Sequence, residues 1–191
     1  SYIPTILADL TSYTVTYSDI KDTFNNLIDV VTLSFETGDW TIPIFEPLLS
    51  TPIHGSSNIE PLIEIKLKFN ETVQVGNIGN ILLKKTVDNS TIETFSSTDI
   101  TVNNDEIIIN PLLLDDLTSY YVLIDAGLIL DNRAPPNNNN NPFGGISSLT
   151  TYTFITRDTS RPTFSVVPIK DEINVGINSN IVLTFNKNIQ L

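Results

Sequence analysis

Few side chains in this sequence of 191 residues could do chemistry beyond its carboxylates. The sequence contains no Cys and no Met, and His54 is its single histidine. Without Cys there can be no disulfide framework, thiolate nucleophile or cysteine-ligated metal centre. His54 would need a nucleophile and an orienting acid to act as a base, and the chain has no Gly-x-Ser-x-Gly elbow. We therefore predict a solvent-facing turn histidine and a chain that is not an enzyme.

Carboxylates in predicted turns are the candidates for a metal site. Calcium is a hard cation that takes about six to eight oxygen ligands. Asp22 and Asp131 lie at corresponding turns of an internal repeat described below, so they are the first choice for calcium ligands. No EF-hand or nonapeptide spacing accompanies them. A solvated acidic surface is the competing interpretation, so the prediction is no cofactor, with calcium as the alternative.

Two Asn-x-Ser/Thr sequons raise the possibility of N-linked glycosylation. They are Asn70-Glu-Thr72 and Asn89-Ser-Thr91, and both lie at strand ends or turns. Sequons also arise by chance in chains rich in Asn and Thr. Asn70 and Asn89 are therefore predicted as acceptors for the case of a secreted eukaryotic protein.

A third group of residues marks predicted junctions between domains. Trp40 lies in the segment Thr37-Gly-Asp-Trp-Thr-Ile-Pro43, and the segment Thr156-Arg-Asp-Thr-Ser-Arg-Pro162 matches it without a Trp. A rigid junction needs buried area, so we expect Trp40, Pro43 and Pro162 to pack between adjacent domains. A carbohydrate platform formed by Trp40 is the alternative.

The overall charge excludes other functional classes. With 10 Lys+Arg and 22 Asp+Glu the formal charge is −12, and nucleic-acid binding rests on clustered basic residues. No apolar run approaches the ~20 residues that span a bilayer. We expect neither a nucleic-acid partner nor a membrane span.

The elements that must position these residues are short strands. In Ile63-Glu-Ile-Lys-Leu-Lys-Phe69 apolar and charged side chains alternate, as in a half-buried strand. Looser alternation predicts further strands at 13–17, 31–35, 106–109, 151–156 and 180–185. Gly76–Asn80 is expected to form a hairpin turn and Pro111–Leu117 a single helical turn. The chain is predicted to be all-β, an antiparallel β-sandwich.

An internal repeat sets the predicted domain organisation. Leu7-Ala-Asp-Leu-Thr-Ser-Tyr13 matches Leu114-Asp-Asp-Leu-Thr-Ser-Tyr120 at six of seven positions, 107 residues later. Pro43-Ile-Phe45 matches Pro162-Thr-Phe164 after 119 residues, and Leu67-Lys-Phe-Asn70 matches Leu183-Thr-Phe-Asn186 after 116. The offset grows because one copy carries an insertion, most simply the loop from Arg133 to Pro142.

This register predicts three units. Residues 1–42 are the C-terminal part of one repeat, 43–158 are a complete repeat, and 159–191 are the N-terminal strands of a third. Neither end piece can form a sandwich alone. We expect a window from a longer tandem array, or alternatively end pieces completed by neighbouring chains through strand addition.

The order of these motifs resembles the SbsA-type bacterial Ig-like domain. The matching segments are Pro43–Phe45, Leu67–Asn70, Leu114–Tyr120, Asp131 and Tyr152–Thr156. The resemblance implies tandem immunoglobulin-like β-sandwich domains, of the kind found in surface-layer proteins, adhesins and as spacers of secreted enzymes. It therefore implies an extracellular or cell-surface location.

The sequence thus predicts a noncatalytic structural segment of an extracellular tandem array: a filament, surface layer or adhesin stalk. Its expected partners are neighbouring copies of itself or adjacent Ig-like repeats. The alternative is a spacer or glycan-binding module of a secreted enzyme, with Trp40 and tyrosines holding the glycan. A calcium-gated array is a third hypothesis.

Overall fold

The computed structural model describes residues 6–132 and 140–190, so the predicted insertion loop lies mostly outside the described residues. The all-β prediction is confirmed: the only helix in the described part is the 3-10 turn Ser97–Asp99. The strands are β1 Ser12–Tyr17, β2 Val31–Glu36, β3 Ser56–Ile59, β4 Ile65–Lys68, β5 Val73–Val75, β6 Ile81–Lys85, β7 Thr91–Phe95, β8 Thr101–Asn103, β9 Glu106–Ile109, β10 Ser119–Ile124, β11 Ile129–Asp131, β12 Thr153–Thr156, β13 Phe164–Val167 and β14 Val182–Phe185.

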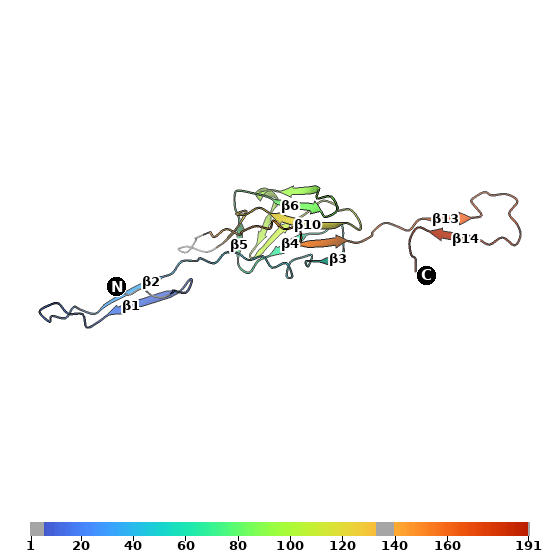
Figure 1. The fold of residues 1–191 in the computed structure, drawn as a ribbon. Helices are drawn as coiled ribbons and strands as arrows, with labels where there is room; N and C mark the ends of the chain where they lie inside the picture. The colour runs from blue at the N-terminus through green and yellow to red at the C-terminus, as the bar shows by residue number, and fades with distance from the viewer. Residues whose placement is uncertain (1–5, 133–139, 191) are drawn as a thin grey trace.

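The central part of the chain, β3 to β12, folds as a two-layer sandwich (Figure 1). One layer is a five-stranded sheet in the order β3-β12-β10-β6-β7. The other layer contains β4-β9-β8 and the pair β11-β5. All pairs are antiparallel except β3, which lies parallel to β12.

Alternating sequence builds the core between the layers. In β4 and just beyond it, Ile65, Leu67 and Phe69 are fully buried, whereas Lys66 and Lys68 point outward and pair with acidic side chains. From the opposite sheet, Tyr120 and Phe154 stack with ring centroids 5.7 Å apart. This packing of both inner faces is the source of the sandwich's stability, because burial of apolar area is the main favourable term in folding.

Two local predictions were wrong. Gly76–Asn80 does not form a hairpin, because it joins β5 to β6 and these strands belong to different layers. Pro111–Leu117 is an irregular connection with a turn at its end, not a helical turn. There the buried side chain of Leu114 and the 3.0 Å bond from its amide to the Pro61 carbonyl fix the backbone to the sandwich. In both segments, tertiary contacts override the local signal.

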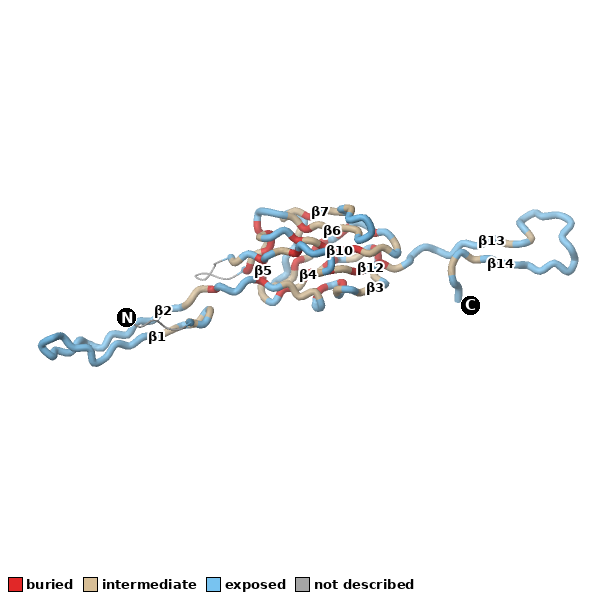
Figure 2. The backbone as a smooth tube through the Cα atoms, in the orientation of Figure 1, coloured by how far each residue is buried: buried red, intermediate tan, exposed pale blue. Residues whose placement is uncertain are grey.

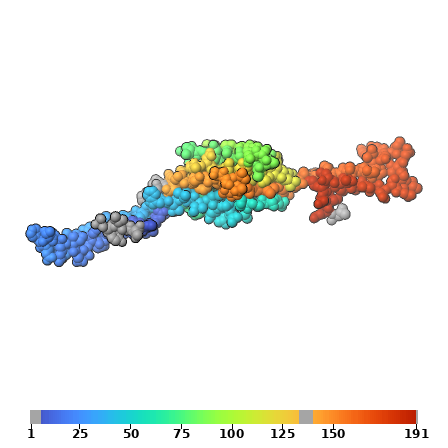
Figure 3. All heavy atoms as spheres, viewed as in Figure 1, coloured from blue at the N-terminus to red at the C-terminus, as the bar shows by residue number. Residues whose placement is uncertain are grey.

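Two hairpins project from opposite ends of the sandwich (Figures 1 and 3). The N-terminal hairpin is β1–β2 and the C-terminal hairpin is β13–β14. Figure 2 shows buried residues concentrated in the sandwich and exposed residues along both hairpins. The molecule is therefore elongated, with one packed core and two strand pairs outside it.

Candidate functional site

The candidate functional sites of this chain are its two junctions. We call residues 37–42 the first junction, which joins the N-terminal hairpin to the sandwich. At the first junction both carboxylate oxygens of Asp9 lie 3.0 Å from the Trp40 amide nitrogen, and the Thr41 hydroxyl donates to Asp9 at 2.7 Å. Bonds from Thr41 and Trp40 hold the pKa of Asp9 below its usual value. These bonds tie the junction back to the start of the hairpin.

The second junction, residues 156–161, repeats this arrangement on the other side of the sandwich. The amide and hydroxyl of Thr159 donate to Asp116 at 2.9 and 2.8 Å, and they lower its pKa. Asp116 is the repeat equivalent of Asp9. Each junction also contains an Asx turn, in which Asp39 accepts the Thr41 amide at 3.0 Å and Asp158 accepts the Ser160 amide at 2.9 Å.

A threonine closes the corner next to each junction. The Thr156 hydroxyl donates to the Asp115 carbonyl at 2.6 Å and accepts the Thr118 amide at 2.9 Å. In the N-terminal hairpin, Thr37 donates to the Ala8 carbonyl and accepts from the Thr11 amide at the same two distances. Because these bonds link segments that are distant in sequence, each junction leaves the fold in a defined direction.

A tyrosine reinforces each corner from inside. The Asp115 amide donates to the Tyr120 hydroxyl at 2.9 Å, and the Ala8 amide donates to the Tyr13 hydroxyl at 2.7 Å. Burial raises the pKa of Tyr120. The neutral phenol therefore remains as the hydrogen-bond acceptor throughout the physiological pH range.

The first junction also carries an acidic cluster, which we define as Asp39, Glu71 and Asp131. Carboxylate oxygens of the three residues lie within 4.8 Å of one another, and Asp39 and Asp131 are fully buried. Asn141 contacts this cluster: its backbone amide and its side-chain amide each donate to Asp131 at 2.8 Å, and the side-chain amide also reaches the Asp39 carbonyl at 3.1 Å. The cluster offers the hard oxygen atoms that calcium prefers.

The second junction has a cation at the matching place. Lys187 is the repeat equivalent of Glu71, and its ammonium lies 2.6 Å from Asp158, the equivalent of Asp39. The Lys187 hydrogen bond is the main reason that the pKa of Asp158 falls to about 2. One junction therefore contains an ion pair where the other contains acids.

The two predicted calcium ligands are not brought together. Asp131 ends β11 inside the sandwich and belongs to the acidic cluster. Asp22 lies in the loop between β1 and β2, where it accepts bonds from Asn26 and Phe24. This loop is the end of the hairpin that points away from the sandwich (Figure 1). Those bonds, chiefly from Asn26, lower the pKa of Asp22. Within the described residues, Asp22 is in no group of three potential metal ligands.

The predicted glycosylation residues are exposed but already hydrogen-bonded. The side-chain oxygen of Asn70 accepts the Ile44 amide at 2.7 Å, and that of Asn89 accepts the Tyr121 hydroxyl at 3.0 Å. These bonds use the amide oxygen, whereas a glycan would attach to the side-chain nitrogen. Both residues remain predicted acceptors.

The predicted packing residues of the junctions differ in burial. Pro43 is buried beside the sandwich, whereas Pro162 is exposed. The Trp40 side chain is 75% exposed, so this residue contributes to the first junction through its backbone bond to Asp9. An exposed indole was not expected of a packing residue.

The prediction that His54 faces the solvent was wrong. It is half-buried, and its Nδ1 accepts the Thr153 amide at 3.2 Å. The neighbouring Gly55 amide donates to the Thr153 carbonyl at 2.7 Å. His54 therefore helps to hold the β3 segment against β12.

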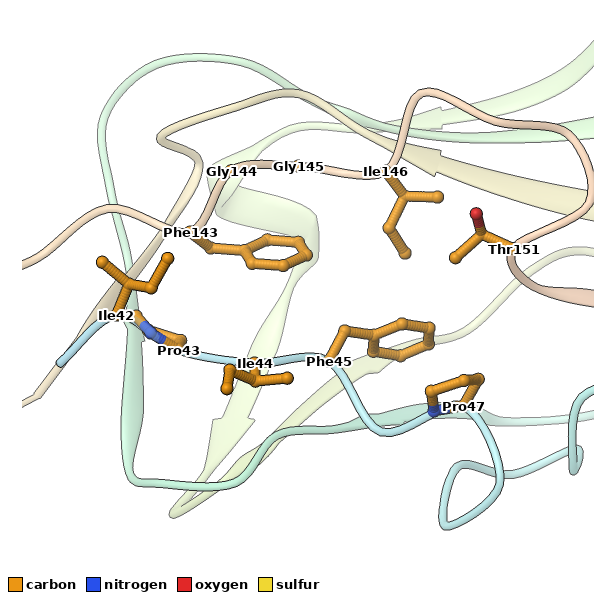
Figure 4. A pocket seen from close by; sticks show the side chains of 10 residues that line it. All are labelled: Ile42, Pro43, Ile44, Phe45, Pro47, Phe143, Gly144, Gly145, Ile146 and Thr151. Atoms are coloured by element: carbon orange, nitrogen blue, oxygen red, sulfur yellow. The ribbon is translucent and has the colours of Figure 1, made fainter.

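An apolar groove of about 400 Å³ lies next to the first junction (Figure 4). Phe45 and Phe143 face it from opposite walls, with Ile44 and Ile146 beside them. Its lining has no carboxylate, histidine or amine, so the groove lacks the groups that acid–base chemistry requires.

A comparison with protein families agrees with this geometry. The model of the bacterial Ig-like domain matches residues 46–156, which is more than half of the chain. The chain belongs to the bacterial Ig-like domain family. Its sandwich is therefore an Ig-like sandwich, and domains of this family are generally noncatalytic and typically lie at the cell surface or outside the cell. No curated protein matches the sequence.

None of the helices among residues 6–132 and 140–190 has the length and apolar composition needed to cross a bilayer.

Most of the acidic cluster was not predicted from the sequence. Asp39 could have been found from the repeat, because Asp158 matches it in the second junction. Glu71 and Asn141 carried no local signal, since the fold alone brings residues 39, 71, 131 and 141 together. The duplicated bonds of Asp9 and Asp116 were likewise not predicted, because the motif that contains them was used only to detect the repeat.

Proposed function

We propose that this chain is a noncatalytic structural segment of an extracellular tandem Ig-like array of the SbsA type, in which modules are joined by short, hydrogen-bonded junctions. The observation that carries the proposal is the duplication of the junction. Asp9 and Asp116 hold the two junction backbones in the same way, and Thr37 and Thr156 close the two corners. A stalk needs the same geometry at each step, and this duplicated bonding supplies it.

The hairpins support the same proposal. In the N-terminal hairpin Tyr13 pairs with Phe35, and in the sandwich the equivalent Tyr120 pairs with Phe154. The ring centroids are 5.7 Å apart in both pairs, with interplanar angles of 23° and 26°. We propose that residues 1–42 are the closing strands of one repeat and that 159–191 are the opening strands of another.

Small-angle X-ray scattering of the dilute full chain tests the array proposal. We expect an elongated profile for the wild type and a broader distribution of maximum dimensions for Asp9→Ala and Asp116→Ala, because each variant releases one junction. Asp88→Ala is the matched control, since Asp88 accepts comparable bonds from Ser90 in a turn inside the sandwich. A wild-type profile as compact as a sphere of this mass, or junction variants identical to the control, would contradict a stiff array.

Calcium at the first junction is a second proposal, favoured by the three carboxylates of the acidic cluster. A cation bound there would link the hairpin side, through Asp39, to the sandwich, through Glu71 and Asp131. We expect millimolar calcium to raise the melting temperature of the wild type and of Asp22→Asn, but not of Asp131→Asn. Melting of the wild type that does not respond to calcium or chelator would exclude this proposal.

Glycan binding by a spacer module is the rival function, favoured by the 75% exposure of Trp40. An exposed aromatic ring next to a groove is a platform on which a sugar face can stack. A glycan-array signal that disappears in Trp40→Ala, with Tyr17→Ala as a control for another exposed aromatic, would favour it. An array without signal would leave the structural function.

A further inference from the structure

We infer that two copies of this chain dock side by side through one face of the sandwich, where an exposed leucine turn of each copy fills the apolar groove of the other. We call residues 46–50, which carry Leu48 and Leu49, the leucine turn. The inference goes beyond the proposed function, because the junctions join modules end to end, whereas this contact joins separate chains laterally.

The first observation is that the leucine turn is an extra loop in what is otherwise a continuous strand. Residues 46–50 separate the two bridges that Phe45 and Thr51 make to the β4 region. In the C-terminal hairpin the equivalent residues Phe164 and Val167 both belong to the unbroken strand β13, with residues 165–166 between them. Five residues therefore stand where the other repeat has two, and the excess forms the turn.

Hydrogen bonds hold the leucine turn in a fixed shape. The Leu49 amide and the Ser50 hydroxyl both donate to the Glu46 carbonyl at 3.0 Å, and the Ser50 hydroxyl accepts the Lys68 amide at 3.0 Å. Ser50 is 1% exposed and anchors the turn, whereas Leu48 and Leu49 are 68% and 65% exposed. Because the turn is already ordered, its apolar side chains lose little conformational entropy when they bind.

The leucine turn lies along the side of the sandwich, whereas the hairpins leave from its two ends (Figure 1). The turn stands beside β4, and the Pro47 carbonyl accepts the His54 amide at 3.0 Å, which fixes the turn to the segment that leads into β3. Both β3 and β4 belong to the sandwich. The exposure of the two leucines is therefore a property of the packed domain and does not depend on the strand pairs outside it.

The second observation is that the apolar groove borders the leucine turn. Pro47 lines the groove and directly precedes Leu48 in the chain, and Figure 4 shows Pro47 at one end of the groove. The groove of about 400 Å³ lies between Phe45 and Phe143 and takes an apolar occupant. A projecting turn and a groove that adjoin on one face are complementary to themselves under a two-fold rotation, in which each turn enters the partner's groove. A second copy therefore satisfies both features at once.

The third observation is that this face carries almost no charge. Residues 42–53 and 143–156 supply the leucine turn and the groove lining, and Glu46 is the single charged residue among them. The whole chain is 17% charged and has a formal charge of −12. Depletion of charged residues is typical of the core of a protein interface. Here it also allows two acidic copies to meet where they repel one another least.

Prolines determine that the contact is made by side chains. Pro43, Pro47 and Pro52 interrupt the segment that runs beside β4, and proline has no backbone amide to donate to another strand. A strand added along this segment would find few hydrogen-bond donors. Docking through the leucine turn and the groove needs no backbone pairing, and it covers apolar side chains that a single copy leaves in water.

Cysteine cross-linking of full chains tests this contact, and the natural absence of Cys makes every introduced thiol unique. Two single variants, Leu48→Cys on the turn and Thr151→Cys in the groove lining, are mixed under mild oxidation, with one of them isotope-labelled to identify the mixed disulfide. The matched control pairs Leu48→Cys with Thr101→Cys, because Thr101 is exposed on β8, which β9 separates from β4. We expect the first pair to exceed the control by about tenfold, because docking raises the effective thiol concentration.

Sedimentation velocity gives an independent readout. We expect the wild type to form dimers as its concentration rises, because a two-fold contact closes on itself. The double variant Leu48→Asp/Leu49→Asp should stay monomeric and keep the wild-type melting temperature, whereas Val87→Asp, a change at an 84% exposed residue in another turn, should dimerise like the wild type.

Three results would overturn the proposal. They are mixed disulfides no more abundant than in the control, dimers that persist in the double variant, and a wild type that stays monomeric at high concentration, which would leave the leucine turn to a partner other than this chain. Scattering of the dilute chain tests the array separately, so failure of the lateral contact is distinguishable from failure of the proposed function.

Discussion

At the scale of single residues, the repeat places the same side chain in two environments. Thr156 is 1% exposed inside the sandwich, whereas its equivalent Thr37 lies half-buried at the hairpin. Both make the same corner bonds, so the pair separates the effect of burial from the effect of hydrogen bonding. Loss of a hydrogen bond lowers the free energy of unfolding most where water cannot replace the missing partner.

We predict that Thr156→Val lowers the free energy of unfolding of the sandwich by about 1–3 kcal/mol, because the Thr118 amide and Asp115 carbonyl lose their partner. Thr37→Val should leave the sandwich transition unchanged. Urea unfolding followed by near-UV circular dichroism measures both. Equal destabilisation by the two variants would contradict this assignment.

The ion pair of the second junction predicts a pH dependence. Lys187, together with the hydroxyl and amide of Ser160, lowers the pKa of Asp158 from 3.8 to about 2. The stabilisation by these bonds is therefore present above pH 4 and is lost as the pH falls toward 2. We expect the Lys187 side-chain resonances to shift over this range in an NMR titration. In Asp158→Asn the same resonances should remain unchanged between pH 5 and pH 2, and a full-sized shift in that variant would refute the pairing.

At the scale of elements, β1–β2 and β10–β12 are equivalent strand pairs of the repeat. The pair β10–β12 packs against the second layer of the sandwich, whereas no second layer covers β1–β2 among the described residues. Val122 and Tyr152 are fully buried, whereas Val15 and Leu33 at the equivalent positions are 37% and 52% exposed. An isolated two-stranded hairpin is marginally stable in water. The hairpin therefore depends on whatever covers its apolar face.

Hydrogen exchange should measure this difference directly. We predict that amides of β1–β2 in the dilute chain exchange by local opening, at least a hundredfold faster than amides of β10–β12, which open only with the sandwich. Equal protection of both strand pairs at low concentration would show that the hairpin is stable alone.

The backbone conformation and surroundings of two glycines in turns of the sandwich predict how much stability each loses on substitution by alanine. Gly145 has a φ of +84°, and a Cβ there would lie 2.6 Å from the Ile124 carbonyl oxygen. Gly55 has a φ of +75°, but nothing lies within 4 Å of its Cβ position. We expect Gly55→Ala to cost about 1 kcal/mol of unfolding free energy and Gly145→Ala distinctly more, because backbone atoms must also move. Thermal unfolding checks the order, and the reverse order would refute it.

At the scale of the whole molecule, charge acts against assembly. Each copy carries a formal charge of −12, so approaching copies repel one another. Contacts made by backbone bonds and apolar side chains are not weakened by salt, whereas repulsion between like charges is screened. If copies of the chain associate as neighbouring modules of the proposed array, we expect the association to strengthen between about 20 and 500 mM salt, where screening becomes effective. Sedimentation at both salt concentrations measures it, and weaker association at high salt would indicate ionic contacts.

Strands and turns differed in how well the sequence predicted them. Alternation located β4, β1 and β12 within one or two residues, because side chains on a pleated strand face opposite sides whatever the neighbouring strand. Gly76–Asn80 and Pro111–Leu117 were misjudged, since the layer to which a strand belongs determines its connection. Local turn chemistry does not contain that information.

The sequence by itself determined the fold class, the absence of cysteine chemistry and the internal repeat. These depend only on composition, on hydrophobic periodicity and on the identity of residues along the chain. Only the tertiary structure decided which repeated residues are buried, and that Asp131 joins Asp39 and Glu71. Burial and edge pairing are relations between segments that are distant in sequence. They exist only once both layers of the sandwich have formed.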